Sequence, residues 1–134
     1  MIKTNGIAPI GIMTADVEAL AKWYIEENGF TVAGKFEAED TTKVIFVTEP
    51  KGIMLELIQK PKGSMIAKQV ALEGSFTDHV AYDVDDVAAV IDYVNEAGLE
   101  IVEQAFLPTF WENGYEYVTI RTPEGEKVEY GKIL

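Results

Sequence analysis

Residues 46–57, FVTEPKGIMLEL, and residues 119–130, TIRTPEGEKVEY, follow one template 73 positions apart in the chain. The template aligns a proline, a glycine and a glutamate of each copy: Pro50 with Pro123, Gly52 with Gly125 and Glu56 with Glu129. Each copy reads as a strand, a turn and a second strand, because apolar and β-branched residues flank the turn-forming proline and glycine. The chain therefore contains an internal repeat, and its fold is predicted to be duplicated.

A second match, at a shift of 70 positions, extends the repeat to the beginning of each half. It lays residues 7–30 over residues 77–99 and aligns Pro9 with His79. The two matches together define four equivalent strand positions, which are occupied by Pro9, Glu56, His79 and Glu129. Three of these residues carry side chains that bind metals, whereas Pro9 has no side-chain donor atom.

The overall composition is that of one globular domain. The chain has 134 residues, 48% of them apolar and 25% charged, which is enough to bury a core. No apolar run approaches the ~18 residues of a membrane span, and the N-terminus lacks the layout of a signal peptide. We therefore expect a single domain, located in the cytoplasm, with no membrane partner.

Charge and cysteine content exclude several classes of function. The absence of cysteine removes disulfides, thiolate nucleophiles and thiolate metal sites, so any metal must have nitrogen and oxygen ligands. The net charge of −12 repels phosphate backbones, which makes nucleic acid a poor partner. The same charge favours solubility, or alternatively a cationic ligand.

Local patterns predict an α+β fold of two tandem βαβββ modules in one domain, residues 1–134. Module one covers about residues 5–60, a linker about 61–75 and module two about 76–134. Residues 65–72 of the linker suit a short helix. The expected strands are residues 7–13, 30–36, 43–48, 53–59, 77–83, 101–107, 115–121 and 127–133.

Capping and turn residues predict where the elements begin and end. Thr14 and Asp85 are the expected N-caps of two long helices, and Gly29 and Gly98 are expected to stop them. The dipeptide 113–114, Asn-Gly, predicts a type I′ hairpin between two strands of module two.

Strand alternation selects the residues that share a face of the sheet. Glu56 lies in a strand that is apolar on both sides, so its carboxylate is costly unless it is paired or coordinated. His79, the only histidine, has small neighbours on its own face. Glu129 alternates with apolar residues as on any half-solvated strand, and only the repeat makes it a site residue. One histidine and two carboxylates suit a divalent ion such as Fe, Mn, Ni, Co or Zn.

The order of these motifs resembles the vicinal oxygen chelate superfamily, which includes glyoxalase I, extradiol dioxygenases, methylmalonyl-CoA epimerase and bleomycin-resistance proteins. The resemblance rests on IMLELIQ around Glu56, DHVAYDVDDV around His79 and the closing TPEGEKVEY, which contains Glu129. It implies a curved, cup-like mixed sheet with helices outside, and a homodimer with sites at or near the subunit interface. In metal-binding members a histidine or glutamine commonly stands at the place of Pro9, and this chain departs from that pattern.

The first hypothesis is a metal-dependent lyase or isomerase that binds its ion through Glu56, His79 and Glu129. By resemblance, the ion supplies Lewis-acid catalysis, and Glu129 or Glu56 acts as the base. A small dicarbonyl, enolisable or hydroxy-carbonyl substrate fits best. Glutathione and coenzyme A carry anionic groups, and Arg121 is the only arginine in a chain of net charge −12.

Two other interpretations stay open. A metal-free protein similar to the bleomycin-resistance group would sequester a cationic aromatic drug or another small molecule. Its pocket would use the aromatic residues Phe106, Phe110, Trp111 and Tyr115, which would otherwise pack the sheet or a dimer interface. In the third interpretation the protein is a degenerate member whose cup serves oligomer packing or an unassigned organic ligand, and His79 with Glu56 forms only a buried polar pair.

Overall fold

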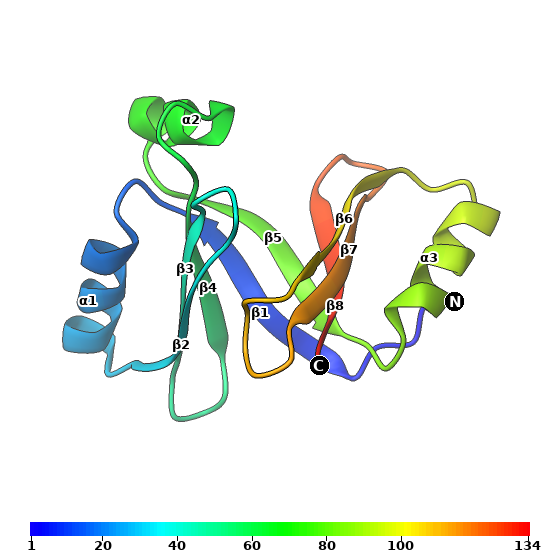
Figure 1. Ribbon diagram of the computed structural model, residues 1–134, viewed down its shortest axis with the longest axis horizontal. Helices are drawn as coiled ribbons and strands as arrows, with labels where there is room; N and C mark the ends of the chain where they lie inside the picture. The colour runs from blue at the N-terminus through cyan, green and yellow to red at the C-terminus, as the bar shows by residue number, and fades with distance from the viewer. The chain divides into compact units, whose positions relative to one another are not determined.

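The structure, a computed structural model, describes residues 1–134 and divides into two compact units. The first unit is Pro9–Asp78, and the second consists of Met1–Ala8 and His79–Leu134. Two βαβββ copies follow each other with one extra helix between them (Figure 1), which confirms the predicted α+β fold class. The elements are β1 (Gly6–Met13), α1 (Val17–Asn28), β2 (Thr31–Glu37), β3 (Lys43–Thr48), β4 (Met54–Gln59), α2 (Met65–Glu73), β5 (Phe76–Asp83), α3 (Val87–Glu96), β6 (Ile101–Leu107), β7 (Tyr115–Arg121) and β8 (Lys127–Ile133).

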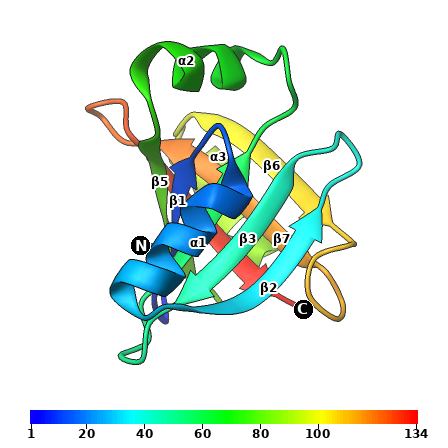
Figure 2. The same ribbon diagram turned by 90° about the vertical axis from the view of Figure 1, so that its left-hand side faces the viewer.

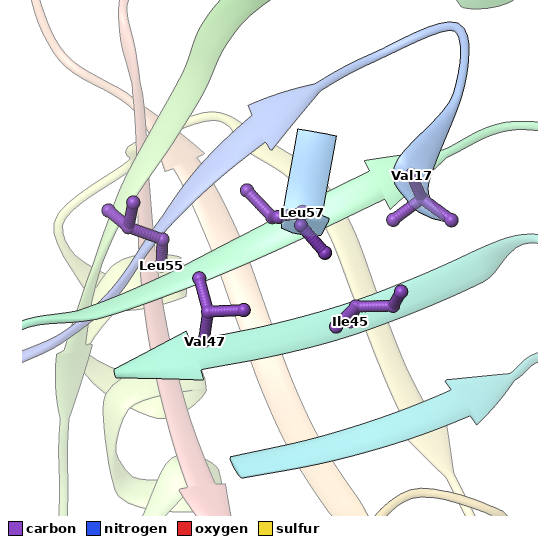
Figure 3. Packing of buried hydrophobic residues seen from close by; sticks show 6 residues of the cluster. Val17, Ile45, Val47, Leu55 and Leu57 are labelled. Atoms are coloured by element: carbon purple, nitrogen blue, oxygen red, sulfur yellow. The ribbon is translucent and has the colours of Figure 1, made fainter. Parts of the chain in front are cut away.

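In the first unit the strands lie in the order β2, β3, β4, β1. β1 runs parallel to β4, whereas β3 is antiparallel to both of its neighbours. Helix α1 packs on one face of this sheet (Figure 2). Every second residue of β3 and β4 points to the helix, so the core between them consists of Val17, Ala21, Ile45, Val47, Leu55 and Leu57 (Figure 3).

The second unit repeats this arrangement. Its strands lie in the order β5, β8, β7, β6, with β5 parallel to β8 and the other pairs antiparallel. Helix α3 packs on β7 and β8. The core under this helix consists of Val84, Val87, Val90, Val94, Val118 and Ile120, with Val128 and Tyr130 packed at its side.

The strand registers confirm the internal repeat residue by residue. Each of the two glutamates has one partner on an antiparallel strand and one on a parallel strand. Glu56 is opposite Phe46 and Gly11, and Glu129 is opposite Thr119 and Ala81. The shift of 73 positions aligns Phe46 with Thr119, and the shift of 70 positions aligns Gly11 with Ala81. The duplication is therefore a property of the backbone pairing as well as of the sequence.

The helix caps differ from the prediction by one or two residues. Asp16 and Asp86 are the N-caps. Each carboxylate accepts a hydrogen bond of 3.0 Å from the backbone N–H of the residue three positions later in the chain. Thr14, predicted to cap α1, instead accepts from the backbone N–H of Asp16, and Asp85 accepts from the side chain of Asn5. The predicted N-caps were wrong because several polar residues precede each helix and any of them could cap it. The residue that caps each helix is the one with an extended backbone directly before the first turn.

The predicted type I′ hairpin at residues 113–114 was also wrong. β6 and β7 are joined by the longer connection 108–114, in which Trp111 and Gly114 have positive φ values of 55° and 103°. A type I′ turn needs positive φ at both central residues, and Asn113 does not have it. Helix α2, by contrast, forms within the linker as expected, with Ser64 as its N-cap. No helix in the chain is both long and apolar enough to cross a membrane.

Replacing the aspartate N-caps tests this assignment. We expect Asp16→Ala and Asp86→Ala each to lower the free energy of unfolding by about 1 kcal/mol, because one N–H at the helix start loses its acceptor. Chemical denaturation measures this change. Glu27→Ala, an exposed change in the last turn of α1, is the matched control and should change stability by less than about 0.5 kcal/mol. Equal effects of Asp16→Ala and Glu27→Ala would contradict the assignment.

Candidate functional site

The chain buries three acidic or basic side chains, and they are the three predicted metal ligands. Glu56, His79 and Glu129 are 8%, 7% and 5% exposed, whereas the other buried polar residues are threonines. Burial of a carboxylate is costly unless other groups compensate its charge. These two glutamates and the only histidine are therefore the buried residues that differ most from the ordinary composition of a protein core.

His79 and Glu129 meet within the second unit. They come from the parallel strands β5 and β8, where the small residue Ala81 lies opposite Glu129. The His79 Nε2 atom lies 3.3 Å from the Glu129 Oε2 atom, and both side chains are 6% exposed. The two residues that the repeat singled out in module two thus contact each other.

Tyr115 holds the second oxygen of the same carboxylate. Its hydroxyl donates a hydrogen bond of 2.7 Å to Glu129 Oε1, and Tyr115 is itself 7% exposed. The tyrosine ring lies directly over Gly131, where an added Cβ would collide with the phenol oxygen. The ring also stacks on Tyr117, with centroids 5.6 Å apart and an angle of 23° between the planes. Each oxygen of Glu129 therefore has its own neighbour.

Glu129 faces away from helix α3. Its neighbours in sequence, Val128 and Tyr130, pack beside the core under that helix, so Glu129 points to the other side of β8. Burial, and to a lesser extent the nearby phenol of Tyr82, raises the pKa of Tyr130 above its ordinary value. The alternation of residues around Glu129 is that of a half-solvated strand. In the structure, however, Glu129 is buried.

Glu56 occupies the corresponding place in the first unit. Leu55 and Leu57 belong to the core under α1 (Figure 3), so Glu56 points to the opposite face of β4. On that face its strand partners are Gly11 and the buried ring of Phe46. Pro9 lies two residues before Gly11 on β1 and is buried, so an apolar ring takes the fourth position of the repeat.

The four residues predicted to line an aromatic pocket differ in environment. Phe106 is 54% exposed, and Trp111 is half-buried in the connection 108–114. Phe110 and Tyr115 are 2% and 7% exposed, so neither offers a ring face to solvent. Their common role in a drug pocket stays a prediction, and Tyr115 has a contact with Glu129 that sequence reasoning missed. The sequence signal for that contact was the glycine at position 131, two residues after the glutamate on the same strand face.

The fold and the family are shown by comparison with known proteins. The model of the glyoxalase/bleomycin resistance protein/dioxygenase superfamily matches residues 6–130, and the chain belongs to this superfamily. The predicted resemblance is therefore confirmed. No curated protein matches the chain in sequence.

Solved structures with this fold include epimerases. Methylmalonyl-CoA epimerase from Mycobacterium tuberculosis superimposes with a TM-score of 0.81 at 17% identity, over 100% of this chain and 91% of that one. The Streptomyces coelicolor methylmalonyl-CoA epimerase in complex with 2-nitronate-propionyl-CoA gives a TM-score of 0.79 at 20% identity, over 97% and 98%. A hypothetical protein from Bacillus halodurans gives 0.81 at 20% identity, over 98% and 96%. At these identities the likeness concerns the fold.

The contact between Tyr115 and Gly131 can be tested by a double-mutant cycle. Gly131 does not have positive φ, so it is the tyrosine ring that excludes a side chain there. We expect Gly131→Ala to lower the free energy of unfolding by about 1–3 kcal/mol, the usual effect of overpacking. In a Tyr115→Ala background the same change should have less than about half that effect, because the ring is gone. Equal effects in both backgrounds, measured by urea denaturation, would show that the ring does not fill this space.

Proposed function

We propose that this protein is a metal-dependent lyase or isomerase of the glyoxalase type, whose ion is held by Glu56, His79 and Glu129. The observation that carries the proposal is the burial of these three residues at equivalent positions of the internal repeat. Each of the three residues can offer one ligand atom to an ion. A buried carboxylate in contact with the only histidine is an arrangement that a cation would stabilise.

The donor atoms fit a divalent transition metal. One imidazole nitrogen and two carboxylate oxygens suit Fe, Mn, Ni, Co or Zn, and the chain has no cysteine that would favour a thiolate site. Because Pro9 has no donor atom, the protein supplies three ligands, the number found in many open catalytic sites. The proline thus changes the number of open positions and leaves the remaining ligand set intact.

The residues have separable roles in the proposed reaction. When bound, the ion would supply Lewis-acid chemistry that stabilises negative charge on neighbouring substrate oxygens. His79 contributes its Nε2 atom and, being neutral in that role, adds no charge to the site. A glutamate carboxylate removes a proton from the carbon beside a substrate carbonyl and returns it to the same or the adjacent carbon.

The substrate is proposed to be a small dicarbonyl, enolisable or hydroxy-carbonyl compound. The epimerases that share the fold are named for a coenzyme A thioester, whose phosphates need cationic partners. In this chain Arg121 is the only arginine, and it donates a 2.7 Å hydrogen bond to the carbonyl of Gly125 and lies 3.9 Å from Glu100. With that guanidinium engaged and a net charge of −12, a compact substrate without phosphates fits better.

The second candidate function is a binding protein that sequesters a cationic aromatic drug. The observation in its favour is the exposed ring of Phe106, 54% accessible on a chain of net charge −12. This role requires no metal and does not use the contact between His79 and Glu129. A homodimer with sites near the subunit interface, and a cytoplasmic location, remain predictions from the sequence.

Metal loading tests the first proposal. We expect the protein, refolded or expressed with Fe, Mn, Ni, Co and Zn supplied separately, to retain close to one ion per chain after gel filtration for at least one metal. His79→Ala should lose most of that metal, since it removes the nitrogen donor. Glu124→Gln, an exposed turn residue, is the control and should retain it. Elemental analysis that finds no bound ion in the wild type with any of the five metals would overturn the proposal.

Solvent proton exchange tests the reaction class. We expect the metal-loaded protein to catalyse deuterium incorporation next to the carbonyl of small hydroxy-ketones or dicarbonyls in D₂O, followed by proton NMR. Removal of the metal by a chelator should abolish the exchange and its return should restore it. A loaded protein that exchanges none of these compounds but binds bleomycin-like cations in calorimetry would favour the second function instead.

A further inference from the structure

The two carboxylate oxygens of Glu129 have different neighbours. Oε1 accepts the hydrogen bond from the Tyr115 hydroxyl at 2.7 Å, and Oε2 faces the His79 Nε2 atom at 3.3 Å. A carboxylate oxygen that accepts a phenol hydrogen bond is a poorer donor to a metal, so Oε2 is the oxygen that would bind the ion. Oε1 is therefore the oxygen that Tyr115 holds, and Oε2 is the oxygen available to a metal ion.

The tyrosine is itself fixed by three features of the sheet. Its ring crosses Gly131, which has no side chain to displace it, and stacks on Tyr117 of the same strand. It is 7% exposed, so water does not compete freely for its hydroxyl. A phenol restrained in this way loses little further conformational freedom when it holds the carboxylate.

This tyrosine belongs to the second repeat only. The shift of 73 positions places Thr42 at the position of Tyr115 and Ile58 at that of Gly131. The registers agree, since Tyr117 is opposite Gly131 in one unit and Val44 is opposite Ile58 in the other. The branched side chain of Ile58 occupies the strand position over which a ring passes in the second unit, and threonine is too short to reach from there. The two glutamates are therefore chemically distinct despite their equivalent backbone positions.

We infer that Tyr115 is a positioning residue that makes Glu129 a fixed, single-oxygen ligand through Oε2. The inference rests on the proposed metal site and goes beyond it by naming a residue outside the ligand set that fixes one of its carboxylates. With Oε1 engaged by the Tyr115 hydroxyl, Glu129 would serve the ion as a ligand through its other oxygen.

The experiment uses Co²⁺ alone as the probe, with no substrate. Tyr115→Phe keeps the ring and removes the hydroxyl. We expect it to weaken Co²⁺ binding about ten- to hundredfold, the usual effect of losing a group that orients a ligand. We also expect the visible d–d bands of bound Co²⁺ to change in position or intensity, because Glu129 is freed to bind through both oxygens. Gly131→Ala, which displaces the ring, should change the same bands even if Tyr115→Phe does not fold.

The control is Tyr130→Phe, which removes a hydroxyl from the opposite face of β8 and should leave the Co²⁺ affinity and spectrum unchanged. Circular dichroism verifies that each variant is folded. If the wild type binds Co²⁺ and Tyr115→Phe behaves like Tyr130→Phe, the positioning role is wrong while the metal site stands. If the wild type fails to bind Co²⁺ or any other of the metals, both the site and the positioning role are wrong.

Discussion

A carboxylate that is removed from water needs a compensating partner, and this constraint governs the face of each sheet opposite its helix. In the second unit the compensation is visible in atomic detail: the Tyr115 hydroxyl on one oxygen of Glu129 and the imidazole of His79 beside the other. Other features of that face serve this arrangement. The small residue Ala81 lies opposite Glu129, and Gly131 has no side chain where the tyrosine ring passes.

The helices and strands were largely predictable because their signals are local. β3, β6, β7 and β8 have the bounds that alternation and turn residues predicted, and Gly29 ends α1 in a left-handed conformation. The N-caps were missed because Thr14 and Asp85 are chemically as suitable as Asp16 and Asp86, and only the backbone selects among them. The Asn-Gly dipeptide forms no type I′ turn because β6 already ends at Leu107, so the longer connection 108–114 joins it to β7.

The site was predictable to a different degree for each residue. Glu56 was conspicuous as a charge between apolar neighbours, and His79 as the only histidine. Glu129 has no local signal, and only its alignment with Glu56 revealed it. Tyr115 was noticed for its ring and its contact with Glu129 was missed, because that contact depends on the diagonal reach of a side chain across two strands. Such reach follows from rotamer and register together, and the sequence marks it only by the glycine at position 131.

The division of the chain has a consequence for the order in which the protein folds. The second unit is assembled from both ends of the sequence, because residues 1–8 belong with residues 79–134. The backbone N–H of Asn5 donates to the carbonyl of Asp83, and the Asn5 side chain bonds to Asp83 at a separation of 78 residues. Closing so long a loop carries a large entropic cost before any contact repays it. During synthesis residues 1–5 therefore cannot make their native contacts with Asp83 until the first module and then β5 have been synthesised.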